Sequence, residues 1–310
     1  MFGSIWDDIK REFSYGNMVN RLIIINVVVF VSVCLLWVIM RLLNAGETPP
    51  LYHNIIQFFE FSSDWKHNLL HPWTLITNTF LHEGFMHIAF NMLFFYWFGR
   101  IVGDLIGDAR VLPLYLMGGI VGNIVFFISV FAFGYGGENT VHFALGASAA
   151  VMAFIVASGF VAPNFLIHLP LLGAIKLKFI VGAWILYDLV GVAGDLNTGG
   201  HFAHLGGALM GWFFVAQLHR GNDLSIPVNR FFRRIRGFFT GLKSQPPPRR
   251  QGPRKVYSNP APRKETFKKN SNMSLSHQEQ LDAILDKIKQ SGYDSLSREE
   301  KEFLFNASNK

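Results

Sequence analysis

Four polar residues in apolar surroundings carry the chemistry that this sequence offers. Ser148 lies in a run of glycine and alanine, His204 is closely followed by two glycines, and His87 and Asn91 are four positions apart. Polar and ionisable groups are costly inside a bilayer, so several of them in apolar segments predict a functional site. A serine, a histidine base and two further hydrogen-bond donors are the groups that acyl transfer needs. The sequence therefore predicts a serine protease that works inside a membrane.

The elements that must position these residues are apolar runs. Half of the 310 residues are hydrophobic, and phenylalanine alone contributes 31. About 20 apolar residues are needed for a helix to cross a bilayer. Runs of about that length predict an all-α membrane protein with a six-transmembrane-helix bundle, and they cover residues 20–43, 85–107, 111–134, 144–162, 178–193 and 200–218.

Lysine and arginine residues fix the expected orientation of the bundle. Cytoplasmic loops carry an excess of these residues. Six spans place both termini on one side, and the basic residues of that side are Lys10, Arg11, Arg21, Arg100, Arg110, Lys176, Lys178 and Arg220. We expect an integral membrane protein with both termini in the cytoplasm, in a bacterial cytoplasmic (inner) membrane.

This orientation places the four polar residues at one depth. Spans two, four and six all run inward from the outer face, and each polar residue lies within the first turns of its span. At a rise of about 1.5 Å per residue, the four side chains share the outer half of the bilayer. A common depth favours a single site.

Each of these residues also has a simpler structural interpretation. Small residues around Ser148 are common where membrane helices approach closely. His87 and Asn91 share one helix face and could form an interhelical hydrogen-bond clamp. A metal site would need a third ligand at this depth. Asp188, the only acidic candidate within a span, falls near the outer end of span five. We therefore expect no metal and no cofactor.

The glycines of span six favour His204 as the base. Gly207 and Gly211 form a small-residue face that would let span six press against the Ser148 segment. His201 lies one turn earlier and nearer the outer surface, so we expect a structural role for it. Because no carboxylate is clearly placed to orient His204, a Ser–His dyad is the expected mechanism.

These motifs resemble those of the rhomboid family of intramembrane serine proteases. The matching elements are His87-x-x-x-Asn91, Gly146-x-Ser148, Ala203-His204-x-x-Gly207-x-x-x-Gly211, and the loop Trp73-x-x-x-Thr77-x-x-Phe80-x-His82. The resemblance covers residues 20–218. It implies that Ser148 is the nucleophile, that His204 is the base, and that His87 and Asn91 stabilise the oxyanion. His82 is a structural candidate.

Three residues depart from the family pattern. Thr74 stands where the family commonly has arginine, which affects the anchoring of the loop. Ala149 and Met152 occupy positions that often hold glycine and an aromatic residue, which affects the packing behind His204.

The segments outside residues 20–218 have other compositions. Residues 1–19 predict an amphipathic interfacial helix. Residues 219–243 form a basic-aromatic strip that we expect on anionic lipid. Residues 244–274 predict a disordered linker rich in proline and basic residues. Residues 275–310 predict a small two-helix cytoplasmic module with a possible protein partner. The net charge of +7 clusters beside the last span, which indicates lipid and not nucleic acid.

The expected function is cleavage of single-pass or polytopic membrane proteins within their transmembrane segments, near the outer face. The alternative from another class is a catalytically inactive rhomboid-like protein that binds transmembrane helices as a chaperone. Such proteins usually lack the serine or the histidine, and this sequence has both. A small-solute transporter would show internal repeats, and none is visible.

Overall fold

The computed structural model describes residues 7, 10–14, 16–135, 140–169, 173–194, 197–241, 277–291 and 295–308. The chain divides into two compact units, Met1–Ser244 and Gln245–Lys310. The disordered linker predicted over residues 244–274 lies outside the described residues. Of the predicted N-terminal helix, residues 10–14 are helical, and most of the remainder is likewise not described.

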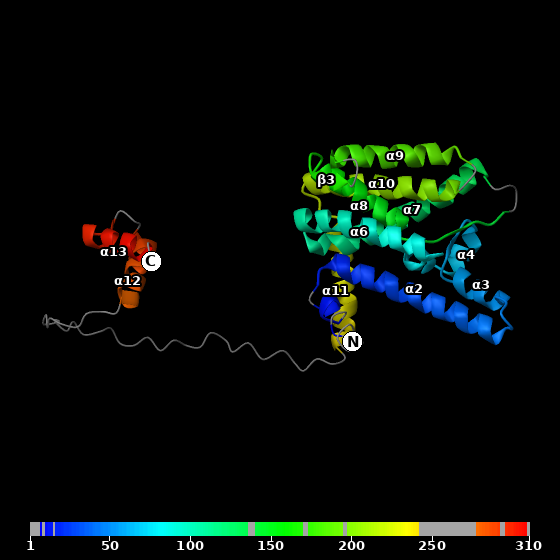
Figure 1. Ribbon diagram of the computed structural model, residues 1–310, viewed down its shortest axis with the longest axis horizontal. Helices are drawn as coiled ribbons and strands as arrows, with labels where there is room; N and C mark the ends of the chain where they lie inside the picture. The colour runs from blue at the N-terminus through cyan, green and yellow to red at the C-terminus, as the bar shows by residue number, and fades with distance from the viewer. Residues whose placement is uncertain are drawn as a thin grey trace. The chain divides into compact units, whose positions relative to one another are not determined.

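Six apolar helices, here called the long helices, make up most of the first unit (Figure 1). Their bounds are α2 (Met18–Leu43), α6 (Phe85–Ile106), α7 (Val111–Phe133), α8 (Ser148–Val161), α9 (Leu177–Val192) and α10 (Thr198–His219). These bounds lie within a few residues of the six predicted apolar runs. Three stretches are long and apolar enough to cross a membrane, namely Met18–Leu43, Phe85–Ile106 and Asp108–Phe133.

Glycines end two of these helices. Gly107 follows α6 with a φ of 101°, and Gly134 follows α7 with a φ of 59°. Positive φ values cost little for glycine because it has no Cβ, and they stop the helix while its last carbonyls find partners. The Gly134 N–H bonds to Val130 O in this way. The apolar runs therefore end in sharp turns.

The segment between α2 and α6 folds over one end of the bundle (Figure 1). It contains α3 (Pro50–Gln57), β1 (Phe61–Ser62), α4 (Trp65–Leu70), α5 (Thr74–Thr77) and the 3-10 helix η1 (Asn78–Phe80). Strand β1 pairs antiparallel with β2 (Phe143–Ala144), directly before α8. This pairing fixes the loop to the segment that leads into Ser148.

Side-chain hydrogen bonds anchor the same loop. The Trp73 indole N–H donates to Phe58 O over 2.8 Å. Thr74 is fully buried, and its Oγ1 donates to His71 O over 2.7 Å. Although Thr74 departs from the family pattern, its hydroxyl closes a turn of this loop.

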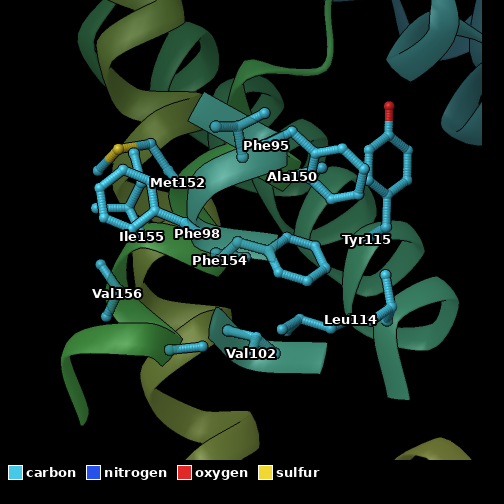
Figure 2. Packing of buried hydrophobic residues seen from close by; sticks show 14 of the residues in the cluster. Phe95, Phe98, Val102, Leu114, Tyr115, Ala150, Met152, Phe154, Ile155 and Val156 are labelled. Carbon is cyan, nitrogen blue, oxygen red and sulfur yellow. The ribbon is translucent and has the colours of Figure 1, made fainter. Parts of the chain in front are cut away.

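Helix α8 lies at the centre of the bundle, where it packs against α6, α7 and α10. All residues from Ala149 to Gly159 are buried. Figure 2 shows Phe95 and Phe98 of α6 and Leu114 of α7 gathered around Phe154 of α8. Dense packing of this kind holds membrane helices together where lipid offers no hydrophobic driving force.

The other end of the first unit carries the β3–β4 hairpin, formed by Leu166–Leu169 and Gly173–Lys176, and helix α11 (Ser225–Gly241). Figure 1 shows α11 running crosswise to the long helices at this end. Polar contacts join this region to the 3-10 helix η2 (Asp108–Arg110). Arg110 forms a 2.7 Å ion pair with Asp223, and Asn229 donates to Ala109 O over 2.9 Å.

The second unit contains α12 (His277–Ser291) and α13 (Arg298–Ser308). Ser297 and Glu300 cap α13 reciprocally, with the Ser297 N–H on Glu300 Oε2 and the Glu300 N–H on Ser297 Oγ. Such a capping box satisfies two backbone donors at a helix start. Lys287 of α12 pairs with Glu300 over 2.8 Å, and Ile284 is buried.

Candidate active site

Ser148 is the first residue of α8, and the turn before it requires a glycine. Gly146 has a φ of 121°, and its N–H donates to Asn78 O over 2.9 Å. A Cβ at this position would lie 2.9 Å from the His87 ring. The imidazole of His87 therefore lies directly over the backbone that leads to Ser148. A side chain at position 146 would strain the turn and also displace His87.

The two glycines of α10 let that helix contact the backbone of α8. A Cβ at Gly207 would overlap with Ala149 O, and a Cβ at Gly211 would overlap with Ala153 O. Small residues at such spacing allow the close approach of two helices. This contact brings the start of α10, which carries His204, beside the start of α8.

A cavity of about 1420 Å³ collects the four residues on which the sequence analysis depends. Ser148, His204, His87 and Asn91 all line it. Within the described residues, Ser148 Oγ and His204 share no hydrogen bond. The Asn91 amide donates to His87 O over 2.8 Å. Further lining residues include Glu83, Tyr135, His142, Met152 and Trp184.

One prediction about this site is wrong. We expected no carboxylate near His204, but Asp188 of α9 is fully buried and lies against it. Asp188 Oδ1 lies 2.8 Å from His204 Nδ1 and 2.8 Å from His201 Nδ1. Because α9 is apolar apart from Lys178 in its first turn and Asp188 near its end, the pattern of its sequence does not show which face meets α10.

His201 differs in setting from its prediction as well. We expected a superficial residue, but His201 is only 9% exposed. Helix α9 covers it, since its ring contacts Tyr187 at a centroid distance of 5.5 Å. His201 does not line the cavity within the described part of the chain, whereas His204 does.

Asp188, His201 and His204 together could hold a metal ion. One ligand atom from each lies within 4.8 Å of the other two. No metal was expected because a third ligand was missing at this depth, and Asp188 could be that ligand. The two 2.8 Å distances are hydrogen-bond lengths. Two donor atoms that each bind one tetrahedral zinc at about 2.0–2.2 Å would instead lie about 3.3–3.6 Å apart.

His82 supports His87 from behind. It is 5% exposed, and the two ring centroids are 5.1 Å apart. Neither ring nitrogen of His82 has a hydrogen-bond partner among the described residues. Burial, together with the neighbouring His87, lowers the pKa of His82 to about 4. His82 is therefore a neutral ring at physiological pH.

A pair of buried asparagines at the cavity wall was not predicted from the sequence. Asn78 and Asn123 exchange two amide hydrogen bonds of 2.8 and 2.9 Å. Asn78 also donates to Ala144 O, in the segment before Ser148. Asn123 lies in the middle of an apolar run, and a polar residue there is a signal that could have been used.

Comparison with known proteins agrees with these motifs. Residues 70–221 match the model of the rhomboid domain. The chain belongs to the rhomboid family. Members of this family are generally intramembrane serine proteases, and the resemblance stated from the motifs is thereby confirmed. Residues 269–310 match a second model, a family of unknown function (DUF6576).

Three relatives illustrate the similarity of this rhomboid protein to others. The presenilin-associated rhomboid-like protein A, mitochondrial, of Danio rerio is 26% identical over 63% of this chain and 50% of its own length. The human presenilin-associated rhomboid-like protein, mitochondrial, is 28% identical over 56% of this chain and 44% of its own. RHOMBOID-like protein 12, mitochondrial, of Arabidopsis thaliana is 30% identical over 51% and 49%.

Two limits on this similarity follow from the relatives themselves. The match spans about half the length of each relative. These three relatives are named as mitochondrial proteins, and a further one, Rhomboid-like protein 11 of Arabidopsis thaliana, is named as chloroplastic. They therefore give no support to the prediction of a bacterial inner membrane.

Proposed function

We propose that this rhomboid protein is an intramembrane serine endopeptidase that cleaves transmembrane segments with Ser148 and His204. The observation that carries the proposal is the shared cavity. It brings a serine at a helix start and a histidine from another helix together with His87 and Asn91. These are the nucleophile, base and donor groups that acyl transfer requires.

The first half of the reaction forms an acyl-enzyme. Ser148 Oγ attacks the scissile carbonyl carbon while His204 Nε2 takes the hydroxyl proton. A base must come within about 2.6–3.2 Å of that proton's oxygen, and such contacts often tighten only when substrate binds. The oxyanion accepts hydrogen bonds from the Ser148 N–H, Asn91 and His87. The N–H groups of the first helical turn are available because they have no partner within the helix.

The second half of the reaction releases the product and regenerates the enzyme. His204 returns its proton to the leaving amine as the C–N bond breaks. Water then enters the polar cavity, gives a proton to His204 and attacks the acyl carbon. Collapse of that intermediate breaks the bond to Ser148 Oγ, and His204 reprotonates the serine.

The proposed setting is a membrane crossed by all six long helices, with both termini on the cytoplasmic side. The positive-inside distribution of lysine and arginine supports this orientation. Substrates would then be single-pass or polytopic membrane proteins that are cut near the outer face. The match covers only about half of each relative, so the substrate class is proposed and is not taken from the relatives.

Two partners outside the cavity belong to the same proposal. Helix α11 exposes four arginines together with Phe231 and Phe238, a composition suited to anionic lipid at the inner leaflet. In lipid nanodiscs, phosphatidylglycerol should raise the thermal stability of the full chain, and Arg233→Gln with Arg234→Gln should reduce that gain. The unit at Gln245–Lys310 would bind a protein partner. Its exposed Leu285 is one candidate contact.

Fluorophosphonate labelling of the purified chain tests the proposal. We expect one modified serine, Ser148, by peptide mass spectrometry, and no label on a folded Ser148→Ala variant. Label on another serine with Ser148 unmodified would contradict the assignment. A folded protein that neither takes up label nor cleaves a model transmembrane substrate would support the alternative, an inactive binder of transmembrane helices.

A further inference from the structure

A carboxylate shared by two histidines lies directly beside the cavity. Asp188 is fully buried on α9, and its Oδ1 contacts the Nδ1 atoms of His201 and His204 at equal distances of 2.8 Å. Its second oxygen, Oδ2, is buried and has no hydrogen-bond partner in the described ranges. Among the described residues, all the hydrogen bonds of this carboxyl group are therefore made to the two imidazoles.

The contact determines which nitrogen of His204 is available for chemistry. A carboxylate oxygen accepts hydrogen bonds, so it selects the tautomer in which Nδ1 carries the proton. The lone pair then lies on Nε2, at the opposite side of the ring. Because His204 lines the same cavity as Ser148, this tautomer supplies the basic nitrogen that the serine hydroxyl requires. The other tautomer would present an N–H to the serine.

We propose that Asp188 is a positioning residue for His204. It holds the imidazole in the Nδ1–H tautomer, and its negative charge stabilises the imidazolium that forms when Ser148 gives up its proton. This inference rests on the proposed function, and it replaces the two-residue mechanism expected from the sequence by one in which three residues act in series. The charge stays on Asp188 throughout, so no proton moves to the carboxylate.

His201 provides the matched control. It contacts the same oxygen at the same distance as His204 but is not among the residues that line the cavity. If the carboxylate served only to join α9 to α10, loss of the His201 contact and loss of the carboxylate should lower stability and turnover to similar extents. If it positions the base, loss of His201 should leave most of the turnover intact, while loss of the carboxylate should not.

The experiment compares full-length wild type, Asp188→Asn, His201→Gln and Ser148→Ala on one model transmembrane substrate in detergent. Asparagine keeps the shape of the side chain but removes the charge. We expect Asp188→Asn to lower kcat by about 10²- to 10⁴-fold with KM little changed. His201→Gln should retain most of the wild-type turnover, because His201 does not line the cavity within the described residues. Melting temperatures measured in parallel identify any loss caused by unfolding.

A spectroscopic measurement on the wild-type chain does not depend on the folding of any variant. Histidine-selective ¹⁵N labelling should show neutral His204 as the Nδ1–H tautomer. The proposal is overturned by an Nε2–H tautomer at His204, by wild-type kcat in Asp188→Asn, or by activity that chelators abolish and zinc restores. Wild type that labels at Ser148 while Asp188→Asn is fully active would reject the positioning role and leave the proposed function intact.

Discussion

The two halves of the helical bundle are filled differently. The half that contains the starts of α6, α8 and α10, here called the cavity half, surrounds a cavity of about 1420 Å³ whose lining combines polar side chains such as Glu83 with apolar ones such as Phe90. The other half, here called the packed half, is filled by rings and aliphatic chains such as Phe95, Phe154 and Leu114, each fully buried (Figure 2). The same helices run through both halves, so one part of a helix lines the cavity and another part packs in the core.

This difference separates stability from chemistry. Close packing in the packed half gives each buried side chain many favourable contacts and leaves no room for water. The cavity half keeps buried polar atoms that have no hydrogen-bond partner in the described part of the chain, such as Asp188 Oδ2 and both ring nitrogens of His82. Such atoms are unfavourable in a low dielectric and are retained where function needs them. Substitutions in the two halves should therefore fail in different assays.

The largest effect should come from the base. We expect His204→Ala to abolish cleavage of a model transmembrane substrate, at a loss of about 10⁶-fold in kcat, because the serine then has no proton acceptor. Its melting temperature should stay near that of wild type. His201→Ala is the control and should retain a substantial fraction of activity. The reverse ranking would identify His201 as the base.

A substitution at the contact of α8 and α10 should lower both stability and turnover. Gly207→Val places a side chain where Ala149 O now lies. Overpacking of this kind costs about 1–3 kcal/mol or more in the free energy of unfolding. Thermal unfolding in detergent would measure it. Gly182→Val is the control, because nothing lies within 4 Å of that Cβ position. Equal melting temperatures for the two variants would contradict the packing described for α8 and α10.

A truncation in the packed half should reduce stability first. Phe154→Ala removes a fully buried ring, and such changes cost about 3–5 kcal/mol in soluble proteins. At temperatures where the variant remains folded, its kcat should be close to that of wild type. Phe131→Ala, at an 88% exposed position of α7, is the control and should change little. A selective loss of kcat in a stable Phe154→Ala variant would show that the halves are not separate.

A change to one oxyanion donor should lower the rate alone. We expect Asn91→Ala to reduce kcat by about 10²- to 10³-fold with KM little changed, because that interaction strengthens only in the transition state. Asn26→Ala is a matched control. Asn26 is buried and bonds to the Tyr115 hydroxyl, but it is not among the residues that line the cavity. A raised KM at unchanged kcat would instead make Asn91 a structural clamp.

The smallest effect should follow removal of the second unit. Truncation after Lys243 should leave cleavage of a model substrate in detergent unchanged, because no described residue beyond His204 lines the cavity. The same truncation should weaken partner binding or substrate delivery in cells. A folded, truncated protein without activity would show that the second unit belongs to the catalytic machinery.

The apolar runs predicted most of the bundle, since length and hydropathy specify a helix without reference to its neighbours. The depth expected for Ser148, His204, His87 and Asn91, from their positions along single helices, also predicted that they share one site. What could not be predicted depends on rotation and long-range pairing. The contact of Asp188 with His204 depends on how α9 is rotated about its own axis. The short strands β1 and β2 pair although the four α-helices α4 to α7 lie between them in the chain, and a two-residue strand has no periodicity to read.

The pairing of β1 with β2 also has a consequence for how the protein folds. Its partners, Phe61 and Ala144, are about 80 positions apart in the chain. Contacts between residues so far apart in sequence form late, because a long loop must close first. The approach to Ser148 therefore reaches its final shape only after α6 and α7 have come together. Backbone amides on both sides of the pair, at Ser63 and at Gly146, should then exchange with solvent through one shared opening event, so that the nucleophile is assembled and lost as a cooperative unit.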